Sequence, residues 1–550
     1  MHRFLRAAVL FTAVTTAACG GPSAPRAGRH ATAAPPLGRV HLPVSCDAAV
    51  QPDFDRALAL LHHMTYPQAR AGFQAVLARD PRCAMAHWGI AMTLFQPLWP
   101  TRPGRAELEA GWQAAERARA LAPASPLERG HIAAVAAFFE DPASDDYWRR
   151  IDRWEAALAA LHESAPDDPE VTAFYALALL ASARPGPSVD QHARAALALL
   201  VPLLRRHPDH PGAMHYIVHA DDTPGRERDN LDIVRRYERA APDNPHAQHM
   251  PTHIYTRLGD WDGVIRGNLR ARAAALRYPA GDRGQFVWDE FAHATEYLVY
   301  AYLQEGADGK AAAAIERLLA TKNIEPTVKT AFHLASTRAR YALERQDWRA
   351  AAAIVPRQPP VVDWDRFPWP EAVSWFARGY GALRSGGGEE PARAIARLAE
   401  LEKRTTDAGE AVFARQIQVL RLDLEAWMRH AAKDDVQATA LLQQAVELEG
   451  ATPKPPVTPA PTLPAPELLG DLFLELGRAG EAADAYRLSL ERFPRRFNST
   501  LGLARALAAA GDRRAATAAF CDLIAIAARG TRAGSLAELR PYRASCRPQR

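Results

Sequence analysis

The spacing of small and aromatic residues near the C-terminus constrains the fold of this chain more than any other feature. Ala482 and Tyr486 lie four residues apart, and Ala516 and Phe520 repeat that pair 34 residues later. The small residue lets two antiparallel helices approach closely, and the ring fills the space beside it. Pro494 stands where it would end the second helix, since proline cannot continue a helix. The chain is therefore expected to contain repeated helical hairpins.

The same spacing recurs along the chain, so the repeat is not confined to one end. It is found at Ala69, Phe73 and Pro81, at Ala196, Leu200 and Pro208, and in the segments 257–268 and 346–354. A hairpin of about 34 residues with this arrangement is typical of the tetratricopeptide repeat, or TPR. Strand signals are scarce, while Ala, Leu, Arg and Glu dominate. We therefore predict an all-α protein, a TPR-type α-solenoid in which antiparallel helix pairs form a right-handed superhelix.

Length and charge narrow the class of protein. The chain has 550 residues, with 67 Lys and Arg against 63 Asp and Glu, for a formal net charge of +4. This small excess gives no electrostatic case for a nucleic-acid partner, so we expect no nucleic acid. Beyond the N-terminus, no stretch reaches the roughly 18 apolar residues in a row that a membrane-spanning helix needs.

The first residues resemble an export signal. Residues 1–18 have a basic start, an apolar run and small residues before Cys19, which is the pattern of a signal peptide. The sequence that ends at Cys19 resembles a lipobox, in which the cysteine is acylated. Thr16 stands where leucine is usual, so ordinary cleavage nearby is an alternative. Residues 19–43 would form a flexible lipoprotein tether. We expect an extracytoplasmic protein, periplasmic or on the cell surface, anchored to the membrane by its N-terminal lipid.

Four cysteines remain once Cys19 is set aside. An extracytoplasmic compartment permits disulfides, and four cysteines can pair in three ways. The simplest connectivity is local, joining Cys46 to Cys83 and Cys521 to Cys546. Each bridge would clamp a terminal repeat, which makes a catalytic cysteine an unfavourable hypothesis.

Two proline-rich interruptions divide the expected array. The sequence predicts an N-terminal and central array, a loop of prolines and aromatics, further helical repeats, an extended proline-rich linker, and a C-terminal repeat pair with a tail. These are assigned to residues 44–354, 355–370, 371–451, 452–465 and 466–550, respectively.

Histidines gather in the middle of the chain. His215 and His219 are four residues apart, as are His249 and His253, and this spacing places two imidazoles on one face of a helix. The two pairs fall on successive repeats, whose first helices lie side by side along the concave face of a solenoid. Because neutral imidazole suits Zn, Cu, Fe and Ni, the four are candidate ligands of a transition metal, with Cu, Fe or Zn the ions considered.

Other interpretations of the histidines stay open. Histidines in a solenoid groove can line a surface for a partner peptide, or simply pack inside the protein. Neither pair reads H-E-x-x-H, so the glutamate base of zinc proteases is missing. Asp222 and Glu296 are the candidate catalytic residues, as base or ligand, although Asp222 is explained as well by a helix cap before a turn. Pro251 marks either a break or a first helical turn.

Several blocks of sequence resemble the extracytoplasmic bacterial TPR proteins. The blocks are LLHHMTYPQARAGFQAVLARDPRCAMAHWGIAM (60–92), MHYIVHA (214–220), HMPTHIYTRLGDW (249–261), HATEYLVYAYLQ (293–304) and PAPELLGDLFLELG (464–477). The resemblance covers most of residues 44–525 and implies fold and location more than activity. The histidines that match its blocks include His62 and His293, which would join the other four only if the superhelix closes tightly. Glu296 departs from the aspartate expected in the fourth block.

Two functional hypotheses follow. In the first, the protein is a binding scaffold for a protein, peptide or small ligand in a concave groove, with metal as an optional component. In the second, it is a metal-dependent oxidase or hydrolase whose histidines hold the ion. An enzyme needs an open coordination position with a substrate pocket beside it, whereas a scaffold needs only a long groove.

Overall fold

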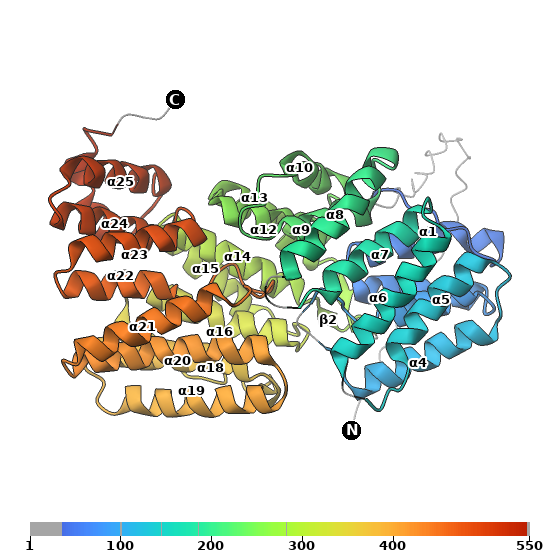
Figure 1. Cartoon of the computed structure of the whole chain (residues 1–550), viewed down its shortest axis with the longest axis horizontal. Coiled ribbons are helices and arrows are strands. Elements are labelled where there is room, and N and C mark those ends of the chain that lie inside the picture. Colours follow the sequence, from blue (N-terminus) through green and yellow to red (C-terminus); the bar gives the residue numbers. More distant parts are fainter. Residues whose placement is uncertain are drawn as a thin grey trace, which may run out of the picture. The chain divides into compact units, whose positions relative to one another are not determined.

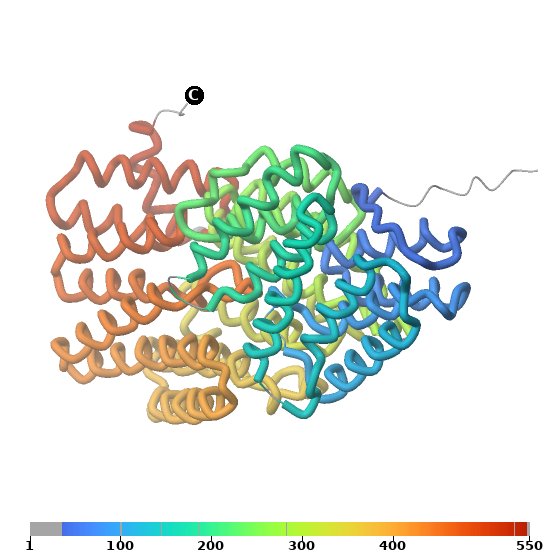
Figure 2. The backbone as a smooth tube through the Cα atoms, turned by 45° about the vertical axis from the view of Figure 1, so that its right-hand side comes forward, coloured from blue at the N-terminus to red at the C-terminus, as the bar shows by residue number. Residues whose placement is uncertain are grey.

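Antiparallel helix pairs follow one another along the chain, as the colours of Figures 1 and 2 show from blue to red. The computed structural model describes residues 36–99, 102–144, 146–184, 186, 188–281 and 283–546. The protein is an all-α, TPR-type α-solenoid, which confirms the predicted fold class. Cys19, residues 1–18 and the first part of the predicted tether lie outside the described residues.

The N-terminal part consists of four helix pairs that follow a short 3-10 helix. Its elements are η1 (Ala48–Val50), α1 (Gln51–His62), α2 (Tyr66–Arg79), α3 (Ala84–Met92), α4 (Arg105–Ala120), α5 (Pro126–Phe139), α6 (Tyr147–Ser164), α7 (Pro169–Ser182) and α8 (Ser188–Arg206).

The central part carries the histidine-rich segments and one small antiparallel hairpin of two strands. Its elements are α9 (Pro211–Asp221), α10 (Leu231–Ala240), α11 (Pro245–His249), α12 (Pro251–Leu258), α13 (Trp261–Ala275), β1 (Pro279–Ala280), β2 (Phe286–Val287), α14 (Glu290–Gln304), α15 (Asp308–Ala320), α16 (Val328–Leu343) and α17 (Trp348–Ala352).

The C-terminal part returns to long regular pairs. Its elements are η2 (Trp364–Arg366), α18 (Pro368–Ser385), α19 (Glu390–Asp407), α20 (Ala411–Ala431), α21 (Asp435–Gly450), α22 (Ala465–Glu475), α23 (Ala479–Arg492), α24 (Phe497–Ala509), α25 (Arg513–Ile526), α26 (Ala533–Glu538) and η3 (Arg540–Tyr542). Among the described helices, none is both long and apolar enough to cross a bilayer.

Small residues set how closely the helices of these pairs approach. The ring of Tyr486 on α23 is buried between α22 and α24. A Cβ added at Gly470 or Gly502 would lie 2.8 or 2.3 Å from that ring, so both positions need glycine. Ala482 is fully buried one turn before Tyr486. The small-then-aromatic spacing seen in the sequence therefore works as a close helix contact.

Aspartate caps start the second helix of several pairs. The side chains of Asp260, Asp347 and Asp512 accept hydrogen bonds from backbone N–H groups three residues later. An aspartate in this place satisfies one of the N–H groups that a helix leaves unpaired at its start. The caps explain why each of these helices begins directly after a short turn.

Two disulfides lie at opposite ends of the described sequence. One joins Cys46 to Cys83 and the other joins Cys521 to Cys546, which is the local pairing considered from the sequence. The first ties the segment before α1 to the start of α3, and the second ties α25 to the C-terminal tail.

The segment predicted to be a linker, residues 452–465, packs inside the protein instead. Val457 and Ala460 are buried. The guanidinium of Arg340 on α16 donates to the carbonyls of Pro461 (2.7 Å) and Ala460, and to Thr458 Oγ1 (2.9 Å). A buried cation thus satisfies carbonyls that no neighbouring strand or helix engages. We call residues 452–465 the proline segment.

Neither proline-rich interruption divides residues 36–546 into separate bodies. In the loop 355–370, Trp364 and Phe367 are buried in a cluster with Phe291 on α14, and α18 already begins at Pro368. The predicted tether, residues 19–43, also ends early, since Leu37 is buried. Apolar side chains in these segments account for the difference, because each finds a covered site on the array.

Candidate metal centre

Six histidines from neighbouring repeats meet in the interior and form two groups. The first histidine group comprises His215 and His219 on α9 and His246 on α11. The second comprises His249 on α11, His253 on α12 and His293 on α14. Within each group, one ring nitrogen of every member lies within 4.8 Å of the others. His219 is partly exposed and the other five are buried.

Helix geometry brings the two sequence pairs together. On α9, the Nε2 atoms of His215 and His219 are 3.1 Å apart, one helical turn from each other. The second pair spans a break, because α11 ends at His249 and Pro251 opens α12. Proline costs little in the first turn, where its missing N–H would have no helical partner. The Nε2 atoms of His249 and His253 still lie 2.9 Å apart across that break.

The Nδ1 atoms of the second group are held by fixed partners. His249 Nδ1 lies 2.7 Å from Asn268 Oδ1, and His253 Nδ1 lies 2.9 Å from Asp222 Oδ2. The amide nitrogen of Asn268 donates to the carbonyl of Val264 (2.9 Å), so its Oδ1 is the atom that accepts from His249. Carboxylate and amide oxygens only accept, so each histidine carries its proton on Nδ1. The Nε2 atom of each neutral ring therefore presents a lone pair.

A relay fixes the third member of the second group in the same way. His333 on α16 donates from Nδ1 to the buried carboxylate of Glu296, which leaves a lone pair on His333 Nε2. That atom lies 3.1 Å from His293 Nδ1, which must donate to it. His293 Nε2 consequently presents a lone pair as well, so all three members offer Nε2 as an acceptor.

The first group shares this arrangement in two of its members. His215 Nδ1 lies 2.7 Å from the carbonyl oxygen of His62, and His246 Nδ1 lies 3.3 Å from Glu290 Oε1. Both partners only accept, so Nε2 carries the lone pair in each ring. Within the described residues, the buried Nε2 of His246 has no hydrogen-bond partner. A buried acceptor left in this state costs free energy unless another group binds it.

Burial keeps these rings neutral. Desolvation, followed by the neighbouring histidines, holds the pKa values of His215 and His293 well below the usual range, and desolvation does the same for His249. Burial also lowers the pKa of His219 to about 3 and lowers the pKa of His253. Neutral imidazole is the form that ligates a metal, so these five side chains need no large proton release to bind one.

Two Nε2 lone pairs at such short distance repel each other unless a cation lies between them. Two nitrogens that bind one ion at 2.0–2.1 Å are separated by about 2.9–3.4 Å for angles between 90° and the tetrahedral value. The separations of 2.9 Å in the second group and 3.1 Å in the first fall in that range. Nitrogen donors anchored through Nδ1 are also how proteins orient metal-binding histidines. The residues present therefore fit a transition metal in each group.

A small cavity of about 20 Å³ touches both groups. His219 and His246 line it from the first group, and His253 and His293 line it from the second. Its volume is enough for about one water molecule. The remaining walls are Leu98, Trp99, Met250, Lys329, Pro456 and Val457, so the loop after α3, the start of α16 and the proline segment cover the histidines. The predicted open concave groove is therefore absent at these six residues, because those segments fill it.

The two candidate catalytic carboxylates lie one step behind the histidines. Asp222 accepts hydrogen bonds from His253 and from Arg257. Burial alone would raise the pKa of Asp222, but the positive charges of Arg257 and Lys454 outweigh it and hold that pKa well below the usual range. Glu296 accepts from Ser336 (2.6 Å) and Arg340 (3.1 Å) as well as from His333. Neither carboxylate lines the cavity, so the structure places both as partners of histidines.

His62 lies in a separate buried group and does not join the six. Its Nε2 is 2.7 Å from Glu170 Oε2, and its Nδ1 is 2.9 Å from the Tyr216 hydroxyl. His210 Nε2 lies 3.4 Å from the other oxygen of Glu170. Both ring nitrogens of His62 thus have protein partners, and His62, Glu170 and His210 form a third buried group whose ligand atoms lie within 4.8 Å of one another. Only the backbone carbonyl of His62 reaches the first group, through His215.

Sequence reasoning missed several residues that the structure brings to the site. His246 was not among the candidate ligands, although it stands three residues before His249 and so shares a helix face with it. His333, Asn268 and Glu290 are not among the candidates that the sequence indicates either. Asn268 and His333 come from helices that carry none of the six histidines, so no local spacing could reveal them, whereas Glu290 stands three residues before His293 on α14.

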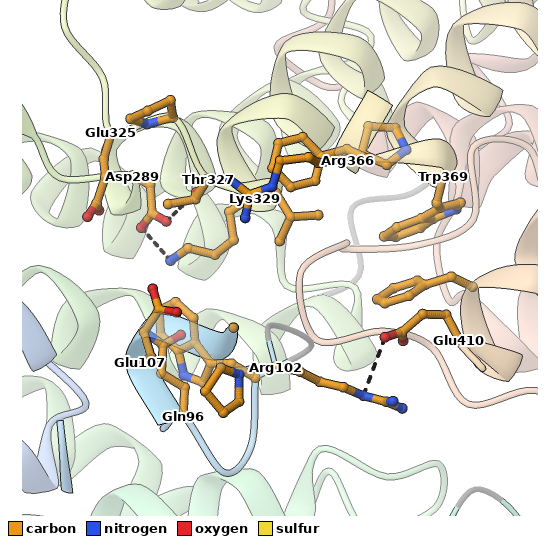
Figure 3. A pocket seen from close by; sticks show the side chains of 18 of the residues that line it. Gln96, Arg102, Glu107, Asp289, Glu325, Thr327, Lys329, Arg366, Trp369 and Glu410 are labelled. Atoms are coloured by element: carbon orange, nitrogen blue, oxygen red, sulfur yellow. Dashed lines mark hydrogen bonds and ion pairs between the residues drawn. The ribbon is translucent and has the colours of Figure 1, made fainter. Parts of the chain in front are cut away.

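A second space, a chamber of about 670 Å³, is shown in Figure 3. It shares Trp99 and Lys329 with the small cavity, so these two side chains separate the two spaces. The Lys329 ammonium lies 3.6 Å from the centre of the Trp99 ring and 2.7 Å from Asp289 Oδ1. It also lies 3.3 Å from Glu290 Oε2, whose other oxygen contacts His246. The chamber and the first group are thereby linked through one lysine and one glutamate.

No known family profile matches the chain, and no curated protein matches it. Solved structures resemble its fold over most of its length. They include a human IFIT1 dimer with PPP-AAAA, 12% identical with a TM-score of 0.39, where the match covers 81% of this chain and 91% of that one. Yeast Tom70 is 10% identical with a TM-score of 0.27, over 91% and 96% of the two chains.

Proposed function

We propose that this protein is a metal-dependent enzyme whose two histidine groups each hold a transition-metal ion. The observation that carries the proposal is the pair of Nε2 lone pairs on His249 and His253, 2.9 Å apart and buried, with both Nδ1 protons committed to Asn268 and Asp222. A bound cation removes the repulsion between them and satisfies the Nε2 of His293 at the same time.

The kind of ligand atoms limits which metal ion the site can hold and which reaction it can support. Six imidazole nitrogens suit Cu, Zn, Fe or Ni, whereas Mg and Ca take oxygen ligands. Three protein ligands for an ion leave a coordination position open, as catalytic sites do, whereas structural zinc sites usually have four. Within the described residues, no carboxylate lines the small cavity. Redox chemistry is therefore favoured over hydrolysis, which more often employs a carboxylate base beside the ion.

The test is the metal content of the purified protein, prepared without chelator and without a nickel column. We expect about two equivalents of a transition metal in the parent. His249→Ala should lose the ion of the second group and His215→Ala the ion of the first. His207→Ala, which changes an exposed histidine of the same region, is the matched control and should keep both. Full metal content in the His215→Ala/His249→Ala double variant would refute the centre.

A scaffold role is the second candidate function. The observation that favours it is the fold itself, since solenoids of helix pairs present long surfaces to protein, peptide or small-ligand partners. A scaffold would keep its partner binding after both histidine groups are removed. Measuring partner capture by the parent and by the His215→Ala/His249→Ala variant distinguishes the two functions, because an enzyme would lose its activity in that variant.

We also propose that the protein is an extracytoplasmic lipoprotein. The signal-like residues 1–18 and the lipobox resemblance at Cys19 support this. The two disulfides add support, because such bonds persist in oxidising compartments. Labelling with radioactive palmitate should mark the parent but not Cys19→Ala, and an unlabelled, non-exported parent would contradict the proposal.

A further inference from the structure

The chamber of about 670 Å³ has the size of a ligand-binding pocket, and its walls carry a specific chemistry. At the end next to the histidines stand Trp99, Trp288 and Lys329, with Asp289 and Glu325 beside them. At the other end, Figure 3 shows Trp369 and Arg366, and Phe413 also lines the space there. The chamber thus has two distinguishable ends.

The far end offers aromatic surface. The Trp369 ring stacks on Phe413 with centroids 5.0 Å apart, and on Phe332 with centroids 4.2 Å apart. Phe413 is only half-buried, so the stack ends at a ring that borders the chamber. A flat aromatic group placed there would extend an existing stack, which contributes binding energy beyond the burial of its area.

The carboxylates of the chamber are mostly neutralised by neighbours. Arg102 lies 3.4 Å from Glu410, and Lys329 lies 2.7 Å from Asp289. Arg357 lies 3.0 Å from Asp365. Burial, together with the charge of Asp289, raises the pKa of Glu325 to about 7, so this acid is partly protonated at neutral pH. The remaining carboxylate, Glu107, is exposed.

In the part of the chain that the structure describes, neither arginine at the aromatic end forms an ion pair as close as these. Arg404 donates to the backbone carbonyl of Asp365 (2.8 Å), and Arg366 lies over the ring of Phe367, 5.6 Å from its centre. After Arg357 and Arg397, respectively, Arg404 also helps to lower the pKa of the exposed carboxyl groups of Asp365 and Glu400, so its positive charge is partly balanced. The charge of Arg366 meets only the face of an aromatic ring among the described side chains, which leaves most of it available to a ligand. Two guanidinium groups beside an aromatic stack recognise a flat molecule that bears a carboxylate or a similar anion.

We propose that the chamber binds an aromatic organic acid, with its anionic group at Arg366 and Arg404 and its opposite end against the wall formed by Trp99 and Lys329. Binding of the acid in the chamber does not depend on the proposed metal centre. Only the further statement that the acid is the substrate of that centre rests on the proposed function. Trp99 and Lys329 line both the chamber and the small cavity beside the histidines. The centre of the Trp99 ring lies 5.5 Å from the centre of the His246 ring. A ligand in the chamber is thereby held next to the first histidine group.

Calorimetric titration of the purified protein with three naphthalene probes tests the ligand class. The probes are 2-naphthylacetate, 2-(2-naphthyl)ethylamine and 2-(2-naphthyl)ethanol, which share a ring and differ in charge. We expect the acetate to bind at least about tenfold more tightly than the other two, since one charge-assisted contact is worth that much. Tightest binding by the amine or the alcohol would overturn the assignment.

Substitutions of residues that line the chamber test whether the probe binds there. Arg366→Gln/Arg404→Gln and Phe413→Ala should each weaken naphthylacetate binding by about tenfold or more. Arg393→Gln is the matched control, because Arg393 lies on the same helix as Arg404 but is exposed and outside the chamber. Equal binding by the double variant and this control would refute the site. These titrations use metal-free protein, so their outcome is independent of whether the histidines bind an ion.

Proximity to the centre is tested with Co²⁺-loaded protein. The nuclear relaxation of the naphthyl protons should increase on binding to the loaded parent and fall to the metal-free level in His215→Ala/His249→Ala. Binding of the acetate without any Co²⁺ uptake would refute the metal centre but leave the chamber. Co²⁺ uptake with no relaxation enhancement would refute the link between them.

Discussion

At the scale of single residues, the Nδ1 partners decide what the six histidines can do. Each anchor forces one tautomer, and the tautomer directs a lone pair at the neighbouring ring. Asn268, Asp222 and His333 do this in the second group, from three different helices or turns. The anchors therefore matter for metal affinity although none of them would touch the ion.

Replacement of His333 tests this idea. In His333→Phe, His293 Nδ1 loses its acceptor and its ring is free to turn, while Glu296 keeps Ser336 and Arg340. We expect the metal affinity of the second group to fall about 10- to 100-fold, with the first group unchanged. Competition against a chromophoric chelator measures both sites.

The control is His131→Phe, the same substitution at a buried histidine outside both groups. It should leave both affinities unchanged. If the two variants lose metal equally, the effect of His333 is general packing and the relay has no special role.

At the scale of elements, the proline segment is held in place by α16. Arg340 joins Glu296 on α14 to the carbonyls of Pro461 and Ala460. In this way one side chain connects the cover of the histidine cavity to the helix that carries His293. Loss of that side chain should loosen the cover and weaken the fold together.

Arg340→Met is the corresponding variant. It leaves the Glu296 charge buried without its cation, and breaking a buried pair in this way costs about 3–5 kcal/mol. We expect the free energy of unfolding in urea to fall by that amount, with faster proteolysis within residues 452–465. Arg349→Met, an exposed arginine on the next helix, should change neither quantity. An unchanged proteolysis rate for Arg340→Met would show that the proline segment is held by other contacts.

The junction of α21 and α22 should make stability depend on pH. Glu449 is buried there and accepts a hydrogen bond from the N–H of Ala465 (3.1 Å). Burial raises its pKa to about 7, against the opposing effect of that hydrogen bond. The folded protein keeps this proton at pH values where the unfolded chain, with an ordinary pKa near 4.5, has lost it. The contribution of Glu449 to stability is therefore largest below pH 4.5 and is lost as the pH rises to about 7.

Glu449→Gln removes the titrating group and keeps an oxygen acceptor for Ala465. Between pH 4.5 and 7, the parent should lose up to about 3 kcal/mol of unfolding free energy relative to this variant. Denaturant unfolding at several pH values gives the two curves. Glu447→Gln, an exposed neighbour on α21, should follow the parent curve. Parallel curves for the parent and Glu449→Gln would mean that Glu449 titrates normally in the folded state.

At the scale of the whole molecule, the proposed ions would join helices of successive repeats. The ligands lie on α9, α11, α12 and α14, between residues 215 and 293. Among these helices, α12 contacts α9 and α11, and α11 contacts α14. A repeat protein is stabilised by the interfaces between adjacent repeats. An ion bound by residues of several repeats adds a link across each of these interfaces. Metal binding should therefore stabilise the folded array as a whole.

Removal of metal tests this expectation. A ligand present at about 1,000 times its dissociation constant adds about 4 kcal/mol to the free energy of unfolding. We expect a strong chelator to lower the Tm of the parent by several degrees in scanning calorimetry. The His215→Ala/His249→Ala variant should start lower and show no chelator effect. A chelator effect of equal size in both proteins would place the stabilising ion elsewhere.

The sequence by itself determined the helical hairpins and the two i,i+4 histidine pairs, because these depend on spacings of four and about 34 residues along one chain. Only the tertiary structure decided how the histidines divide into two groups, and that His62 stands apart with Glu170. It also showed that the proline segment is a buried cover, and that Trp99 and Lys329 separate the centre from a chamber. These features join residues that are tens to hundreds of positions apart. Their contacts depend on how successive hairpins pack, which no local spacing records.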